Sequence, residues 1–183
     1  MKLVFPMSLS GGLECMLAAG RYGRYWEENK EEIIAALYAH TKLRFKQRKI
    51  TVHVISGSTS RAGNSVRPME LSIENVTQDE IAYTLVHELS HRLVIGNGIQ
   101  PSAKNDHARS RASYNMHRHI FLFLYDVMVD LIGADRASRC VANERALHVA
   151  LYDKAWSWAL DMTYDERQAA FSRLKKSYKT GVH

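Results

Sequence analysis

A chain of 183 residues is long enough to bury the core of one compact domain and too short for two ordinary ones. Hydrophobic residues make up 46% of it and charged residues 24%, proportions that exclude a disordered or low-complexity protein. No apolar run approaches the roughly 20 residues of a membrane span, and the 2 cysteines form no C-x-x-C pair. We therefore expect a single cytoplasmic domain over residues 1–183, without disulfides.

The first half of the chain predicts one helix and two strands. Residues 1–22 contain several glycines and are expected to form an irregular lead-in. Apolar residues at helical spacing predict a helix from about Trp26 to Arg48. Residues 50–55 and Met69–Ile73 alternate apolar and polar side chains, which is typical of half-buried strands. The Gly- and Ser-rich stretch 57–65 between them predicts a loop.

A second helix is predicted after the strands. Thr77 and Glu80 have the spacing of a capping box, in which each side chain binds a backbone N–H that the first helical turn leaves unpaired. An apolar face follows, and Gly96-Asn-Gly98 is expected to end the helix.

The rest of the chain predicts a polar loop over residues 100–109 and then three helices. The first runs from about Ser110 to Leu131, and Asp135 is expected to cap the second, which continues to about Leu160. Thr163 and Glu166 predict another capping box before a last helix that ends near Ser177. Strands followed by helices favour an α+β fold, with a small sheet packed against the second helix and additional C-terminal helices.

The second predicted helix contains His87-Glu-Leu-Ser-His91, an HExxH motif. Residues i and i+4 lie on one helix face, so His87 and His91 present two imidazoles to one point, as a tetrahedral Zn²⁺ site requires. Glu88 lies about 100° around the helix axis, where it can reach a metal-activated water without ligating the metal. We therefore predict Glu88 as the general base of a zinc-dependent hydrolase.

The segment 71–75 (LSIEN) followed by TLVHELSH at 84–91 resembles the zincin metallopeptidases, and among them the SprT-like branch is the most similar. The resemblance covers residues 50–95 and implies a zincin-like fold that hydrolyses peptide bonds in a peptide or protein substrate. It also implies that Met69–Ile73 is the sheet edge along which an extended peptide would bind. The chain departs from the SprT-like pattern after the motif, because His107 is followed by alanine rather than glycine.

A catalytic zinc needs a third protein ligand. We prefer His117, because it begins an apolar stripe of its helix that is expected to face the core. Asp126, His119 and His107 remain alternatives. His117 and Asp126 are nine residues apart, on opposite sides of a straight helix, so they cannot both bind one ion.

Three further expectations concern the surroundings of this site. Tyr114 and Tyr125 are candidates to donate a hydrogen bond to a reaction intermediate, although packing is the simpler role for both. Asp130 could orient a histidine ligand. If a fourth protein ligand closes the coordination sphere, the chain would bind metal without catalysis.

The formal net charge of +6 raises the question of a polyanionic partner. Lys42–Lys49 contains five basic residues around Phe45 and no acidic one. The simpler interpretation is the solvated, basic last turn of a helix, favoured by the helix dipole. The alternative function is a nucleic-acid-associated module, in which the zinc is structural or activity depends on bound DNA.

Overall fold

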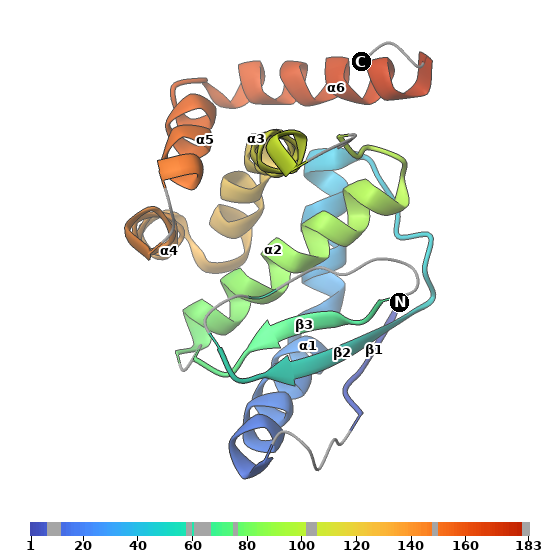
Figure 1. Cartoon of the computed structure of the whole chain (residues 1–183), viewed down its shortest axis with the longest axis vertical. Coiled ribbons are helices and arrows are strands. Elements are labelled where there is room, and N and C mark those ends of the chain that lie inside the picture. Colours follow the sequence, from blue (N-terminus) through green and yellow to red (C-terminus); the bar gives the residue numbers. More distant parts are fainter. Residues whose placement is uncertain are drawn as a thin grey trace. The chain divides into compact units, whose positions relative to one another are not determined.

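The computed structural model describes residues 1–6, 12–57, 60, 67–74, 77–101, 106–147 and 150–180, and of residues 106–111, 147 and 151 it describes the backbone alone. This part of the chain is α+β, with three strands and six helices (Figure 1). Its residues group into two compact units. Unit 1 contains residues 1–35 and 43–97, and unit 2 contains residues 36–42 and 98–183. No helix within the described ranges is long and apolar enough to cross a membrane.

Unit 1 contains a three-stranded parallel sheet in the order β1-β2-β3, formed by Lys2–Val4, Lys49–Ile55 and Met69–Ser72. Parallel neighbours need a crossover connection, and α1 (Gly12–Thr41) provides it between β1 and β2. Lys2 pairs with Lys49, and Val52 pairs with Met69. The strands predicted at 50–55 and 69–73 are confirmed, and β3 is an edge of the sheet in the described residues.

One face of the sheet is buried. Ile50 and Val52 of β2 are buried while Lys49 and His53 are exposed, which is the alternation expected of a strand with one covered face. The Tyr22 hydroxyl of α1 donates a hydrogen bond to the Ser72 carbonyl of β3. The helix α2 (Gln78–Gly96) also contacts β3.

Both ends of α2 follow the prediction. Thr77 accepts a hydrogen bond from the Glu80 backbone N–H, and the Glu80 carboxylate accepts one from the Thr77 backbone N–H, so the capping box is confirmed. Asn97 follows the last helical residue, and Gly98 has a φ of +80°, the left-handed conformation that favours glycine after a helix.

In unit 2, α3 (Asp106–Ile132) packs against three helices, which are α4 (Ala134–Leu147), α5 (Ala150–Leu160) and α6 (Tyr164–Thr180). Phe121 of α3 stacks on Trp156 of α5 with ring centroids 3.8 Å apart. Phe123 meets Phe171 of α6 edge to face at 5.0 Å. All four rings are buried, so α3 is the centre of this unit's core.

Several predicted boundaries are wrong. The lead-in expected over 1–22 contains β1 and the start of α1, because Cys15, Ala18 and Tyr22 bury one face of a helix despite its glycines. This helix ends at Thr41 rather than Arg48, since Lys42 takes the left-handed conformation with a φ of +56°. The basic run is therefore not a helical turn.

Three boundaries after α2 also differ from the prediction. The backbone of α3 begins at Asp106, within the stretch predicted as a polar loop. The helix predicted from Asp135 to Leu160 is divided into α4 and α5, and residues 148–149 lie outside the described residues. Asp135 lies in the first turn of α4 instead of capping it. The second capping box is confirmed by reciprocal bonds between Thr163 and Glu166.

Candidate metal centre

His87 and His91 converge in the middle of α2. Their Nε2 atoms lie 3.1 Å apart and their ring centroids 5.0 Å apart, with the ring planes inclined by 38°. Both residues are buried, at 6% and 9% exposure. The helix places them one turn apart on one face, as the i, i+4 spacing predicted. The structure thus brings two imidazole nitrogens to one point inside unit 1.

This separation fits two ligands of one metal ion. Zinc binds histidine nitrogen at about 2.0–2.1 Å, so two ligands of a tetrahedral ion lie roughly 3.3 Å apart. A hydrogen bond between the two rings fits the same distance, provided that one Nε2 carries a proton and the other does not. Two histidine nitrogens at this separation are therefore suited to zinc. Measuring the metal content of the protein distinguishes a shared zinc ion from a hydrogen bond between the rings.

Glu88 is buried beside the pair, at 6% exposure. Its negative charge acts on Arg92, one helical turn further on. Burial lowers the pKa of the Arg92 guanidinium, and the charge of Glu88 partly opposes that effect. A buried carboxylate thus shares this helix face with a buried cation.

Arg92 also connects the motif helix to the chain that enters the edge strand. Its Nη2 donates a 2.6 Å hydrogen bond to the carbonyl of Arg67, two residues before β3 begins. Arg92 was not among the residues predicted from the sequence. The signal that could have found it is the i, i+4 spacing of an acid and a base within the motif helix, which places Glu88 and Arg92 on one face.

The other residues around the motif are apolar or aromatic, or form their hydrogen bonds within the helix. Tyr83 meets the His87 ring nearly edge-on, with centroids 5.9 Å apart and an interplanar angle of 68°. The Ser90 hydroxyl donates to the Val86 carbonyl one turn earlier. Leu85 and Leu89 are fully buried on the same helix. The motif is therefore part of the core of unit 1 rather than of a solvated helix face.

His117, the preferred third ligand, belongs to unit 2 and is buried there at 6% exposure. Its Nδ1 lies 2.8 Å from the Ser113 carbonyl one turn earlier on α3. A carbonyl only accepts, so this nitrogen carries the proton and Nε2 keeps its lone pair. The ring packs against Tyr152 and Phe121, at centroid distances of 4.3 and 5.6 Å. The tautomer is the one that a histidine needs to bind a metal through Nε2.

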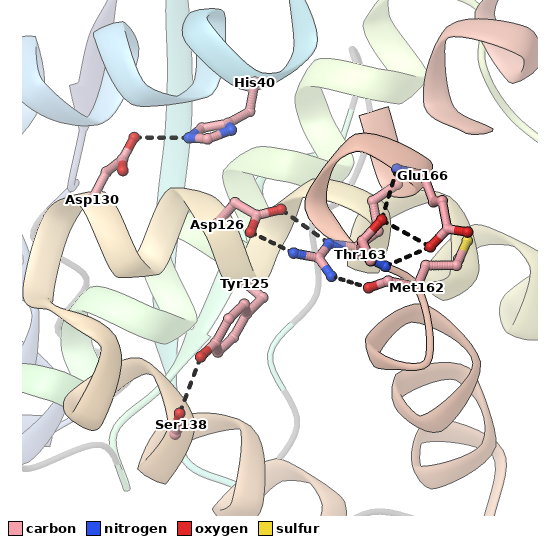
Figure 2. Close-up of polar contacts among 9 residues, drawn as sticks. His40, Tyr125, Asp126, Asp130, Ser138, Met162, Thr163 and Glu166 are labelled. Carbon is pink, nitrogen blue, oxygen red and sulfur yellow. Dashed lines mark hydrogen bonds and ion pairs between the residues drawn. The ribbon is translucent and has the colours of Figure 1, made fainter. Parts of the chain in front are cut away.

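Asp126, another candidate ligand, forms an ion pair with Arg167. Both of its carboxylate oxygens accept hydrogen bonds from Arg167 in the core of unit 2, as Figure 2 shows. Asp130, four residues further on, accepts a 2.7 Å hydrogen bond from Nε2 of His40, at the end of α1 (Figure 2). These two carboxylates support the packing of α6 and of the end of α1 against α3.

The other two ligand alternatives lie at the start and in the middle of α3. Burial, reinforced by the positive charge of Arg118, lowers the pKa of His119 to about 4, and its ring meets Tyr178 edge-on at 5.8 Å. This environment favours a neutral histidine at physiological pH. His107 lies in the first turn of α3, but its side chain is outside the described residues.

The two tyrosines have structural contacts. The Tyr125 hydroxyl is 3.2 Å from the Ser138 hydroxyl of α4 (Figure 2), and the guanidinium of Arg118 lies over the Tyr114 ring at 5.6 Å. Tyr152 and Trp156 pack against the Phe121 ring. Both cysteines are free and buried, which agrees with the expectation that the chain has no disulfide.

No family model, curated protein or solved structure matches this chain. The geometry of the residues themselves must therefore support any assignment of function.

Proposed function

We propose that the protein is a zinc-dependent metallopeptidase whose metal is held by His87, His91 and His117. The observation that supports this most is the 3.1 Å approach of the His87 and His91 Nε2 atoms beside the carboxylate of Glu88. Two neutral imidazoles and a neighbouring acid are the donor set of a hydrolytic zinc site. The zincin-like, SprT-like resemblance of the sequence belongs to the same proposal.

The assignment of the third ligand rests on the state of each candidate. His117 is buried, and the Ser113 carbonyl fixes the tautomer that presents Nε2 to a metal. Asp126 is engaged by Arg167 through both oxygens, so its use as a ligand would leave a buried guanidinium unpaired. His117 is therefore the better candidate.

Zinc, when bound, would acidify a water molecule and polarise the carbonyl of the scissile bond. Glu88 would accept the proton that this water loses and deliver it to the leaving amine. The charge of Arg92 would act on this carboxylate from one helical turn further along α2. His87 and His91 would keep their positions because the core of unit 1 surrounds them.

The substrate in this proposal is an extended peptide. A strand at the edge of a sheet leaves backbone donors and acceptors open, and an extended peptide can pair with them. Among the described strands, β3 pairs with β2 alone. Its residues Met69–Ser72 lie a few residues before α2, so the proposed peptide-binding edge and the motif belong to one unit.

The test compares Glu88→Gln with wild type in zinc content and in hydrolysis of an unstructured protein such as casein. Glutamine keeps the shape of the side chain but accepts no proton. We expect zinc to remain near one ion per chain and the rate of hydrolysis to fall by about 10²–10⁴-fold, the usual contribution of a general base. Glu32→Gln, at an exposed site on α1, is the charge-matched control and should retain full activity.

Three results would contradict the proposal. Wild-type protein prepared in zinc-containing medium with no bound metal would show that the two rings form a hydrogen bond instead. Zinc at full occupancy with equal hydrolysis by wild type and Glu88→Gln would exclude the assigned base. Zinc without any hydrolysis would favour the non-catalytic metal-binding alternative.

A further inference from the structure

One short segment of the chain is strongly basic. Lys42–Lys49 contains five of the 25 basic residues and none of the 19 acidic ones, which is nearly the whole formal net charge of +6. The segment leaves α1 and leads into β2. The proposed peptidase reaction makes no use of it, so its function is a separate question.

Within this segment, exposure alternates along the chain. The basic residues are exposed, whereas Leu43, Phe45 and Gln47 between them are half-buried. The first strand adds one more exposed lysine. We call the exposed basic side chains of unit 1 in this region the basic strip: Lys2, Arg44, Lys46, Arg48 and Lys49.

Backbone hydrogen bonds hold the strip in place. The Lys2 N–H donates to the Arg48 carbonyl at 2.9 Å, and the Asn97 side chain donates to the Arg44 carbonyl at 3.1 Å. The strip is thus attached to β1 and to the end of α2. A surface with a fixed backbone loses less conformational entropy when it binds a ligand than a flexible tail does.

The strip also carries an uncompensated repulsion. Lys2 and Lys49 are register partners on neighbouring strands, which are about 4.8 Å apart. Like charges directly opposite each other destabilise a sheet. In the part of the chain that the structure describes, neither lysine forms an ion pair, and the same is true of Lys46 and Arg48. A bound anion would remove this repulsion.

We propose that the basic strip binds the phosphate backbone of a nucleic acid, without reading its sequence. A run of exposed cations along the chain is suited to a linear polyanion, and binding of this kind derives its free energy from the release of counterions. Phosphate contacts position a protein on a nucleic acid but do not distinguish bases. The strip has the charges to contact phosphates. The neighbouring Phe45 is half-buried, so it is not an exposed platform on which bases could stack.

Two other anionic partners fit less well. Attachment to an anionic membrane is strengthened by exposed apolar side chains that enter the lipid, but the apolar residues of this segment, Leu43 and Phe45, are half-buried. A specific complex with an acidic protein needs an apolar centre surrounded by charge, whereas the strip consists of charge alone.

The test measures binding of fluorescent oligonucleotides, single-stranded and duplex, by anisotropy at several salt concentrations. The strip variant carries Lys46→Gln, Arg48→Gln and Lys49→Gln. The matched control carries Lys154→Gln, Arg173→Gln and Lys176→Gln, which removes the same formal charge from exposed sites on α5 and α6. Circular dichroism verifies that both variants are folded. The assay contains no peptide substrate, so its result is independent of the proposed hydrolysis.

We expect wild type and control to bind with a steep dependence on salt. The strip variant should bind at least tenfold more weakly at low salt, and its log–log salt slope on duplex DNA should be smaller by about 2.7, because each neutralised phosphate adds about 0.9 to the slope. No binding by wild type at low salt would overturn the proposal. An equal loss in the control would show an effect of net charge alone. Strip-dependent binding to phosphatidylserine vesicles but not to oligonucleotides would identify a membrane surface instead.

Discussion

Both carboxylate oxygens of Asp126 accept hydrogen bonds from the Arg167 guanidinium, at 3.1 Å from Nε and 2.6 Å from Nη2. The two residues are 41 positions apart and both are buried, so this pair joins α6 to α3 in the core of unit 2. Arg167 also donates to the Met162 carbonyl at 2.6 Å, just before α6 begins (Figure 2).

Loss of one partner from this buried pair should be costly. Asp126→Asn would leave the guanidinium without its counter-charge, and we expect the free energy of unfolding to fall by about 3–5 kcal/mol. Asp153→Asn is the control, because Asp153 pairs with Arg145 at a half-exposed site and should cost about 1 kcal/mol or less. Urea unfolding of the three proteins measures the difference. An Asp126→Asn variant that is as stable as the control but has lost its zinc would make Asp126 the third ligand.

Zinc should stabilise the folded protein through its histidine ligands. At a free concentration of 100 times Kd, a ligand specific for the folded state contributes about 2.7 kcal/mol, which corresponds to a rise in Tm of roughly 5–10 °C for a chain of this size. We expect wild type to show this rise, and His87→Ala, His91→Ala and His117→Ala to lose most of it.

Two histidines provide the controls for that measurement. His53 is exposed on β2, and His119 lies two residues from His117 on α3. His53→Ala and His119→Ala should keep the zinc-dependent rise in Tm, after comparison with each metal-free variant. If His117→Ala keeps the rise and His119→Ala loses it, the third ligand has been assigned to the wrong residue.

The N-terminal cap of the motif helix should contribute measurably to stability. Thr77→Ala removes the hydroxyl that accepts the Glu80 N–H, and a lost cap of this kind costs about 1 kcal/mol. Thr77→Ser keeps the hydroxyl and should remain close to wild type. Thermal unfolding of the metal-free proteins compares them. Equal destabilisation by alanine and serine would show that the methyl group, and not the cap, matters at this position.

The second capping box predicts a dependence on pH. Hydrogen bonds from the Thr163 backbone and side chain lower the pKa of Glu166 below its ordinary value of 4.5. A lowered pKa in the folded state means that the charged carboxylate stabilises the fold above pH 4.5 and loses this effect as the pH falls through the folded-state value.

Glu166→Gln should therefore unfold at a lower temperature than wild type at neutral pH, and the difference should shrink on acidification below about pH 4.5. Thr163→Val removes the hydroxyl that donates to this carboxylate, so part of its difference from wild type should shrink over the same range, and the part due to the lost acceptor of the Glu166 N–H should remain. A difference in Tm that remains constant down to about pH 3 would show that the carboxylate charge has no part in the cap.

The local features of the motif helix could be predicted from the sequence. Its cap, its end and the convergence of His87 and His91 depend on residues within a few positions of one another, and helical geometry alone relates them. The strands β2 and β3 were predictable for the same reason, since their alternation records which side chains are buried.

Features that depend on distant partners were not predictable. Asp126 has no sequence signal for Arg167, and the three residues of β1 become a strand only by pairing with β2 after a 30-residue helix. The end of α1 was missed because Lys42, rather than a glycine, takes the left-handed conformation. The bond from Arg92 to the Arg67 carbonyl spans 25 residues and was not predictable, although the i, i+4 spacing of Glu88 and Arg92 is a local signal.

The division of α1 between the two units has a consequence for dissecting the protein into fragments. Unit 2 takes residues 36–42 from the N-terminal half of the chain, and these include His40 and Thr41, the partners of Asp130 and Lys175. A recombinant C-terminal piece that starts at Gly98 would lack both anchors. Fragment expression would therefore yield an incomplete bundle, and circular permutants or co-expressed halves are the better route to separate study of each unit.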